Sequence, residues 1–463
     1  MCPVADLPFE KHLTANNYFN DNGEFEPALF SMDLQKILHI VTIKDNRDIY
    51  IYNDKEGYYE SNGEETLRAL TKKVLRLKYR ELHAKATIDD ITASTHIERE
   101  DFHHPPHLIP VENGLINLQT PEPHQLLPHD SKYYVTGVLP VEYNPNAKCP
   151  KFDKFLEQIL PQTSDRIKIQ EGFGNCLTTS TDYMIIYMLV GEGSNGKSTL
   201  LNVLFALLGK VNVSSVSLFD LAYGQWYTAD LFGKLANIYA DIESHELKST
   251  GNIKILTGDD TAKGERKYQR HFNFKNNAKP WFSANKIPYS HDDSNAFYRR
   301  FRIIRFTQEF REGEADPQMI RKITTKAELS GILNWALEGL HRLVKQKTFS
   351  FLESVEERRR MWQIESNSLQ AFINDCIDCV IGRYITKEKL YQAYTEYCVK
   401  RNLQIMTKDK VGKILQTLLP NVGEIYKLVG NKQEKSWSGI CLKEEVSEQK
   451  VLDTVGENAE ITL

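Results

Sequence analysis

The segment GEGSNGKST, residues 191–199, constrains the fold of this chain more than any other part of its sequence. It matches the pattern G-x-x-x-x-G-K-[ST], which arises by chance in a chain of this length with a probability of only about 1 to 2%. An apolar, partly β-branched run over 184–190 precedes the motif, and a leucine-rich run over 200–208 follows it and ends at Gly209. This strand, loop and helix context predicts a P-loop inside an α/β domain.

The residue types of the motif suit the phosphates of a nucleotide. Gly191, Gly193 and Gly196 leave room for backbone N–H groups to turn toward an anion, and the amino end of the following helix adds positive potential. Lys197 is expected to bridge the terminal phosphates, and the Ser198 hydroxyl to contact Mg²⁺. The alternative is a Gly/Ser turn that happens to contain a lysine. We expect ATP and Mg²⁺ as cofactors, held by Gly191, Glu192, Gly193, Ser194, Asn195, Gly196, Lys197, Ser198 and Thr199.

Two further segments place acidic and amide groups at the ends of expected strands. The run 235–240 is strand-like and leads into Asp241 and Glu243. In ATP hydrolysis one carboxylate holds the Mg²⁺ shell and another orients the attacking water, so we assign Asp241 to the metal and Glu243 to the water, with the division of roles left open. A third strand over 280–284 ends at Asn285, a candidate sensor of the γ-phosphate, because open α/β sheets bind ligands at the carboxyl ends of their strands. Each segment taken alone is also compatible with an ordinary strand end.

The composition is that of a soluble globular chain with reduced thiols. Its 463 residues are 41% hydrophobic and 26% charged, which favours about two to four folded domains and excludes a disordered chain. No apolar run is long enough to cross a bilayer and no secretory signal is visible, so we expect a cytoplasmic protein. Seven cysteines, an odd number, argue against a disulfide framework. Because the net charge is -4, contact with nucleic acid requires a local basic patch.

Two small clusters contain residue types that can bind metals, but we interpret neither cluster as a metal site. Cys376 and Cys379 form a CxxC pair, but no second pair completes a zinc site, so packing in a helix core is expected. His103, His104 and His107 lie among prolines without an evident carboxylate partner, which favours a solvated loop.

In the order of its motifs the chain resembles the superfamily III helicases, in particular the poxvirus-type primase-helicases of viruses, phages and plasmids. The resemblance is carried by GEGSNGKST, ANIYADIES, KILTGDDTAKGERKYQRHFNF, KPWFSANKIP and AFYRRFRIIRF. Upstream, LIPVENGLINL and LPVEYNPNAKCPKFDKFL are similar to the N-terminal segment of the family, and residues 368–443 are similar to its winged-helix segment. Relatives often carry a primase domain as well, but residues 1–100 lack an evident catalytic carboxylate set, so no priming activity is expected.

The resemblance and the local patterns together predict an α/β chain with an AAA+-like P-loop core on a parallel sheet. A hairpin over 48–60, a helix over 64–78 and a long helix over 327–352 are expected from periodicity. The predicted domains are an N-terminal α+β region (1–105), a connector and helical collar (106–180), the P-loop ATPase core (181–365), a winged helix (366–443) and an acidic flexible tail (444–463).

The resemblance further implies a hexameric ring with ATP bound between subunits, so that each site needs an arginine from a neighbour. We carry this arginine-finger role to Arg300, with Arg299 as the second choice. Basic and aromatic residues alternate over 261–275, either as an ordinary surface hairpin or, as the resemblance implies, as a pore hairpin that grips single-stranded DNA. The DNA-binding candidates are Lys263, Arg266, Lys267 and Tyr268.

The resulting prediction is an ATP-hydrolysing replicative DNA helicase of a virus, provirus or plasmid. The family implies a homo-hexamer that moves 3′-to-5′ on single-stranded DNA in the cytoplasm of the host, with a separate primase or polymerase as a further partner. Two alternatives stay open: an ATP-regulated, origin-binding initiator with little unwinding activity, and a packaging or RNA motor. The helix expected over 407–418, with its lysines, is compatible with DNA contact or with protein docking.

Overall fold

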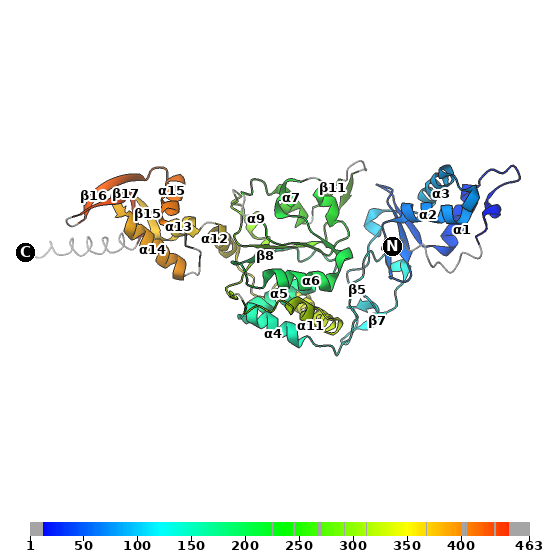
Figure 1. The fold of residues 1–463 in the computed structure, drawn as a ribbon, viewed down its shortest axis with the longest axis horizontal. Helices are drawn as coiled ribbons and strands as arrows, with labels where there is room; N and C mark the ends of the chain where they lie inside the picture. The colour runs from blue at the N-terminus through cyan, green and yellow to red at the C-terminus, as the bar shows by residue number, and fades with distance from the viewer. Residues whose placement is uncertain are drawn as a thin grey trace, which may run out of the picture.

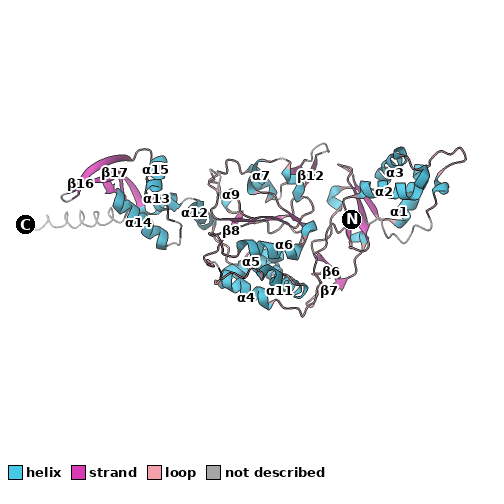
Figure 2. Ribbon diagram, viewed as in Figure 1, coloured by secondary structure: helices cyan, strands magenta, loops and turns pink. Residues whose placement is uncertain are grey.

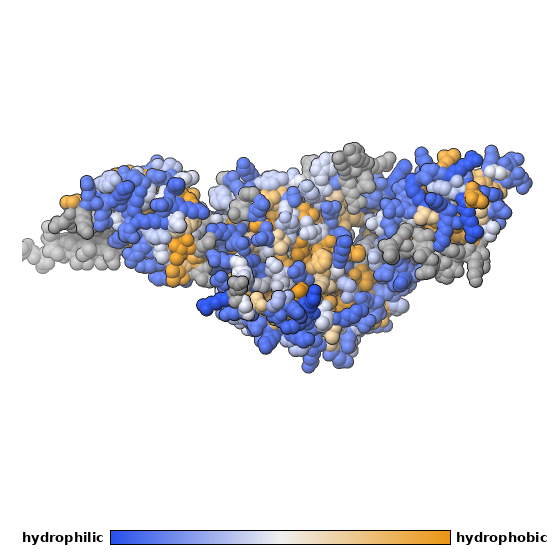
Figure 3. Space-filling view, viewed as in Figure 1, coloured by the Kyte–Doolittle hydropathy of each residue, from blue (hydrophilic) through white to orange (hydrophobic). Residues whose placement is uncertain are grey.

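The computed structural model describes residues 13–443 apart from residues 225, 244–245, 259, 266–270, 291, 312, 367, 401–402, 404 and 430–431. An N-terminal lobe, a large central lobe with the P-loop motif and a C-terminal lobe follow one another along the molecule (Figure 1). On the face seen in Figure 3, hydrophilic side chains cover most of both terminal lobes, and hydrophobic ones gather chiefly over the central lobe. No helix in the described part of the chain is both long and apolar enough to cross a membrane.

The N-terminal lobe consists of α1 (Pro27–Ile37), β1 (Ile40–Ile43), β2 (Ile49–Asn53), β3 (Tyr58–Glu60), α2 (Gly63–Leu75), α3 (Glu81–Ser94) and β4 (His96–Ile97). Its strands form a sheet of order β3-β2-β1-β4, in which β2 and β3 are the expected hairpin. The expected helix over 64–78 is α2 followed by a 3-10 turn. Phe30, Leu34 and Leu67 are fully buried between helices and sheet, because apolar residues at helical spacing share one face.

A three-stranded antiparallel meander links the N-terminal lobe to the central lobe. It contains β5 (Leu108–Val111), β6 (Gly114–Asn117) and β7 (Gln125–Leu127), and a turn at Asn113-Gly114 joins its first two strands. Val111 also bridges to Leu139, so the chain that follows the meander returns to its edge.

Five parallel strands form the central sheet: β8 (Ile186–Val190), β9 (Val213–Ser214), β10 (Ala236–Tyr239), β13 (Lys279–Ala284) and β14 (Phe301–Arg305). Their order across the sheet is β14-β8-β13-β10-β9, so the three strands expected from the motifs are neighbours. Every residue of β8 is buried, which explains why its sequence is a continuous apolar run. The prediction of an α/β domain with a parallel sheet is confirmed.

Two layers cover the faces of this sheet (Figure 2). One layer contains α4 (Pro150–Ile159), α5 (Thr163–Asn175), α6 (Lys197–Leu208), α10 (Met319–Ile323) and α11 (Lys326–Gln346). The other contains α7 (Leu218–Tyr223), α8 (Gly251–Leu256), α9 (Asn295–Tyr298), α12 (Val355–Ser366) and the hairpin of β11 (Ala262–Gly264) and β12 (Phe272–Phe274). Tyr187 and Leu189 belong to the first core, and Met188 and Val190 to the second, because successive strand side chains point to opposite faces.

The first of these cores includes helices that precede residue 181, the expected start of the ATPase core. The rings of Phe152 on α4 and Phe173 on α5 lie 5.1 and 5.6 Å from that of Trp335 on α11. Phe173 also contacts Trp281 of the sheet at 5.7 Å. The helix expected over 327–352 ends earlier, at Gln346, where Lys347 takes a left-handed conformation with φ +57°.

The C-terminal lobe contains α13 (Ser368–Cys376), β15 (Ile377–Thr386), α14 (Lys387–Lys400), α15 (Lys408–Leu418), β16 (Gly423–Val429) and β17 (Lys432–Leu442). Its strands form an antiparallel sheet of order β15-β17-β16, and the expected helix over 407–418 is α15. The prediction that Cys376 and Cys379 pack in a helix core holds for Cys376, which packs against the core of this lobe, and was wrong for Cys379. Cys376 ends α13 and is half-buried, and Cys379 is exposed on β15, because the chain pairs with β17 from Ile377 onward.

A buried ion pair ties the sheet to its first helical layer. Arg302 on β14 and Glu171 on α5 are both fully buried, with Nη1 of Arg302 3.5 Å from Oε2 of Glu171. The backbone N–H of Ser350 donates to the same carboxylate at 3.0 Å, and Arg302 donates to the Ser350 carbonyl. The guanidinium also lies 4.9 Å from the centre of the Phe349 ring. Loss of Glu171 would leave Arg302 buried without this anion, and loss of Arg302 would leave the buried Glu171 with the more distant Arg342, whose Nη1 lies 4.0 Å from Oε1.

Replacing Arg302 with Met should lower the free energy of unfolding of the central lobe by about 3–5 kcal/mol, because Glu171 would stay buried without its fully buried cation and keep only the 4.0 Å contact to Arg342. Urea unfolding followed by tryptophan fluorescence measures this change, since Trp281 and Trp335 pack in the same core. Arg321→Met, at an exposed position of α10, is the control and should change stability by no more than about 0.5 kcal/mol. Equal effects of the two substitutions would contradict this role of Arg302.

Candidate functional site

Two glycines fix the shape of the loop between β8 and α6. Gly196 has a left-handed φ of +86°, and a Cβ there would lie 2.5 Å from Cγ2 of Ile159. A Cβ on Gly191 would lie 2.5 Å from the carbonyl oxygen of Phe306. Gly193 has open space around it, so packing does not require glycine at that position. The first and last glycines therefore hold the turn that leads into the amino end of α6, where a helix attracts anions.

Lys197 is buried inside this loop. Its Nζ donates hydrogen bonds to the carbonyl oxygens of Gly191 at 2.5 Å and Glu192 at 3.2 Å. A third bond goes to Oδ1 of Asn195 at 3.0 Å. Burial lowers the pKa of the ammonium, and the charge of Asp241 raises it. All three acceptors are neutral oxygens, so the charged oxygens of a phosphate would be stronger partners for this cation.

The acidic segment after β10 turns across the carboxyl end of β13. The backbone N–H of Asp241 donates to Oγ of Ser283 at 3.0 Å, and that of Ile242 to the Ser283 carbonyl at 2.9 Å. Asp241 has a left-handed φ of +61°, which Asp tolerates better than most residues. Asp241 and Glu243 are both exposed, and Asp241 lies near enough to Lys197 to affect its pKa. The division of roles between the two acids stays a prediction.

Asn285 is the exposed residue that directly follows β13. Because β13 pairs with β8 on one side and β10 on the other, Asn285 lies between the loop and the acidic segment. The backbone N–H of Gly191 donates to the Ala284 carbonyl at 3.3 Å, which joins the start of the loop to the end of β13. Ser198 is exposed in the first turn of α6. The structure thus gathers a cation, carboxylates, a hydroxyl and an amide at one edge of the sheet, a set able to hold a phosphate with its divalent metal.

The two candidate arginines differ in burial. Arg300 is 7% exposed, and its guanidinium donates to the carbonyl oxygens of Lys254, at 3.0 Å, and Ala296. Burial, and then the charge of Arg299, lower the pKa of Arg300. Arg300 therefore ties α9 to α8 within its own chain, whereas Arg299 is exposed. The sequence Tyr-Arg-Arg-Phe does not reveal which arginine faces the core, and the finger role of Arg300 or Arg299 stays a prediction.

The expected basic hairpin is present as the antiparallel pair β11 and β12. Phe272 and Phe274 point into the second core, so they are not the aromatic residues that could stack on bases. The side chain of Lys263 is 55% exposed and forms an ion pair with Glu265 at 2.6 Å. The remaining DNA-binding candidates lie outside the described residues: Arg266, Lys267 and Tyr268.

Arg99, which the sequence did not single out, anchors the N-terminal lobe to the base of this hairpin. Its guanidinium lies 4.5 Å from the centre of the Phe232 ring and 4.2 Å from that of Phe272. It also donates to both carboxylate oxygens of Asp45, at 2.6 and 2.8 Å. A single arginine in a charged stretch carries no sequence signal for such a contact, because its partners lie far away along the chain.

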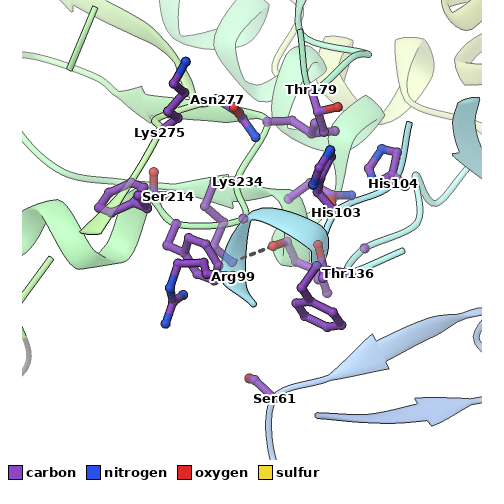
Figure 4. A pocket seen from close by; sticks show the side chains of 18 of the residues that line it. Ser61, Arg99, His103, His104, Thr136, Thr179, Ser214, Lys234, Lys275 and Asn277 are labelled. Carbon is purple, nitrogen blue, oxygen red and sulfur yellow. Dashed lines mark hydrogen bonds between the residues drawn. The ribbon is translucent and has the colours of Figure 1, made fainter. Parts of the chain in front are cut away.

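A cavity of about 1200 Å³ lies away from the P-loop edge, between the N-terminal lobe and the β9 side of the sheet (Figure 4). Its lining mixes both charges with hydroxyl groups and includes none of the catalytic candidates. Residues that line it and are labelled in Figure 4 include Ser61, Arg99, Thr136, Ser214, Lys234 and Lys275. The candidate site is therefore located by the chemistry of the loop and its neighbours, and not by cavity volume.

His104 lies in the wall of this cavity and contradicts the prediction of a solvated loop. His104 is 5% exposed, and burial lowers its pKa to about 4, so it is not part of a solvated loop. The Pro106 carbonyl accepts a hydrogen bond from the Thr178 hydroxyl at 2.8 Å, which pins this stretch against the central lobe. His103 is exposed, as expected, and His107 is half-buried.

Three family models match successive parts of the chain. They are described as "D5 N terminal like" over residues 34–161, "Family of unknown function (DUF5906)" over residues 189–300 and "Poxvirus D5 protein-like" over residues 364–453. The middle match contains the loop, the acidic segment, Asn285 and both candidate arginines, so the candidate site lies within one family unit.

Similar proteins have also been named or solved. The chain is 27% identical over 221 residues to "Putative helicase L207/L206" of Acanthamoeba polyphaga mimivirus, a match that covers 46% of this chain and 23% of that protein. The apo structure of the NrS-1 C-terminal region has 14% identity and a TM-score of 0.45, with 90% of this chain and 100% of that chain covered. Its A form gives 13% identity and a TM-score of 0.44, with 89% and 98% covered. The two D5-type models and the viral relative confirm that this chain resembles the superfamily III helicases of the poxvirus type.

Proposed function

We propose that this chain is the motor of an ATP-dependent replicative DNA helicase of a virus, provirus or plasmid. The observation that carries the proposal is the position of Lys197, Asp241 and Asn285 at the carboxyl edge of one parallel sheet. The D5-type matches and a relative that is named a helicase favour unwinding during replication as the process that this site drives. The chain spans 23% of the length of that relative, so the activity of the whole relative extends beyond the part that this chain matches.

Each residue of the site then has a role in hydrolysis. The phosphates of ATP lie against the P-loop, and Lys197 exchanges its carbonyl partners for the β- and γ-phosphates. Ser198 and Asp241 hold Mg²⁺, which neutralises the charge that develops on the leaving group. Glu243 orients the attacking water, and Asn285 contacts the γ-phosphate.

The active form in this proposal is a homo-hexameric ring with ATP between subunits. The exposed Arg299 reaches the γ-phosphate of the neighbouring subunit, where its planar fork stabilises the transferring group. An AAA+-like core is supported by the strand order, in which β8 lies between β13 and β14. The hairpin of β11 and β12 follows the acidic segment along the chain and carries Lys263 at its exposed side. We propose that this hairpin contacts single-stranded DNA. The proposed direction of movement along the DNA is 3′-to-5′.

We propose that the C-terminal lobe is a winged helix, with α15 as its recognition helix and β16 and β17 as its wing, and its element order supports this. Lys410 and Lys413 of α15 are exposed, and Lys408 is ion-paired with Glu388. We propose that this lobe docks DNA or a partner protein, such as the separate primase or polymerase that priming requires. The host cytoplasm is the proposed location.

An origin-binding initiator that uses ATP for assembly is the second candidate, because the exposed lysines of α15 also suit duplex DNA. An initiator would assemble with ATP but hydrolyse it at a rate that single-stranded DNA does not change. The rate of hydrolysis with and without single-stranded DNA, measured beside unwinding of DNA and RNA forks, separates the candidates.

Lys197→Ala should lower the DNA-stimulated rate of ATP hydrolysis by at least about 100-fold, because the P-loop loses the buried cation proposed to contact the phosphates. The rate of phosphate release from ATP and Mg²⁺ measures the effect. Lys210→Ala, at an exposed position just past α6, is the matched control and should keep the wild-type rate. Hydrolysis that survives in a folded Lys197→Ala protein would refute the site assignment.

Arg299→Ala should abolish hydrolysis without loss of stability, whereas Arg300→Ala should lower the melting temperature, because Arg300 holds α8 and α9 together. If Arg299 acts across subunits, an equal mixture of Arg299→Ala and Lys197→Ala should regain activity. In randomly mixed rings about a quarter of interfaces then pair an intact loop with an intact arginine. If the mixture is as inactive as each variant alone, Arg299 acts in the site of its own subunit or takes no part in hydrolysis.

A further inference from the structure

A cluster of two histidines and a glutamate lies where the loop between β6 and β7 meets helix α11. Glu122 and His124 come from the loop, and His341 comes from the second half of α11. One nitrogen or oxygen of each residue lies within 4.8 Å of the others. His124 is buried, while the side chains of His341 and Glu122 are 31% and 66% exposed. The cluster is therefore anchored on one side and open to solvent on the other.

The partners of the two rings decide which nitrogen carries a proton. His124 Nδ1 lies 2.8 Å from the carbonyl oxygen of Thr120, which can only accept, so this nitrogen donates. His341 Nδ1 lies 2.5 Å from Oε1 of Glu122, a carboxylate that accepts in the same way. In both neutral rings the lone pair is therefore on Nε2, the nitrogen suited to bind a metal.

These two Nε2 atoms face each other at a distance of 2.9 Å. Two lone pairs that face each other repel, so the arrangement requires a cation that both nitrogens share. Histidines that bind metals almost always donate their other N–H to a carbonyl or carboxylate oxygen, and both rings do so here.

We propose that His124 and His341 bind a divalent transition-metal ion of the zinc class through their Nε2 atoms, with Glu122 orienting His341 from behind. Glu122 is assigned to support and not to direct ligation, because its oxygen contacts Nδ1, the nitrogen on the far side of the ring from the metal. Water fills the remaining coordination positions on the exposed side.

The distance between the nitrogens suits this class of ion after a small adjustment. Metal–nitrogen bonds of about 2.05 Å at a tetrahedral angle place two ligand nitrogens about 3.3 Å apart, so the rings need to separate by about 0.4 Å. The partly exposed His341 ring has room to move by that amount. Imidazole ligands favour zinc, copper and nickel over magnesium, so the Mg²⁺ used with ATP would not compete for this site.

A metal ion here would extend an existing seam between α11 and the segment after the meander. Ser330 Oγ donates to the Glu142 carbonyl at 2.8 Å, and Asn334 Nδ2 donates to the Asn144 carbonyl at 2.8 Å. The backbone N–H of His124 donates to the Tyr143 hydroxyl at 3.2 Å. His341 lies about two turns beyond Asn334, so the ion would fasten the meander to the far half of the same helix.

The test uses full-length protein stripped with a chelator and kept free of nucleotide and Mg²⁺. Co²⁺ serves as the coloured probe, and Zn²⁺ is added in competition. We expect one Co²⁺ per chain with d–d absorption bands, displacement by Zn²⁺ and a melting temperature that rises with metal concentration. His341→Gln should remove this binding, and Glu122→Gln, which keeps both rings, should weaken it by about 10- to 100-fold.

His96→Gln, which removes an exposed histidine on β4, is the matched control and should bind as wild type. Unchanged binding in both His341→Gln and Glu122→Gln would overturn the proposal. So would a thiolate-to-cobalt charge-transfer band that disappears in Cys379→Ser, because the ion would then be on the exposed thiol. Absence of metal binding, with a melting temperature that His341→Gln changes only below neutral pH, would show that the two rings share a proton instead.

Discussion

The pairing of β13 with β8 on one side and β10 on the other is the contact on which the candidate site depends. β8 leads into the P-loop, β10 leads into the acidic segment, and β13 ends between them at Asn285. The backbone at the end of β13 bonds both neighbours, since Ala284 accepts from Gly191 and Ser283 accepts from Ile242. Groups that are distant in the sequence therefore meet because three parallel strands end at one edge.

The same sheet explains how the site is supported from below. Side chains of β8 alternate between two apolar cores, so neither face can slip without exposing a core to water. Arg302 adds a polar link, because its charge is paired with Glu171 on the neighbouring helix and its guanidinium also donates to the carbonyl of Ser350. The loop with Lys197 is thus built on a base that is rigid in both its apolar and its charged contacts.

The sequence predicted well those parts of the fold whose cause is local. The P-loop, its strand and helix, the acidic strand end and the sensor strand each follow from a run of neighbouring residues. Contacts between distant residues could not be read in this way. Burial of Arg300, which favours Arg299 as the exposed arginine, depends on carbonyl oxygens of Lys254 and Ala296. His104 lies in a stretch whose Pro106 carbonyl accepts a hydrogen bond from the distant Thr178 hydroxyl, and the strand character of β15 depends on pairing with β17.

The central claim is that ATP and its metal bind at the carboxyl edge of the central sheet and that a neighbouring chain completes the site. A reconstruction of the full-length protein with Mg²⁺, a non-hydrolysable ATP analogue and single-stranded DNA tests it most directly. The account predicts a closed ring with phosphates against residues 191–199, Arg299 of the next subunit at the γ-phosphate and DNA beside the hairpin of β11 and β12. Nucleotide bound in the cavity near His104, or single chains with an empty P-loop, would contradict it.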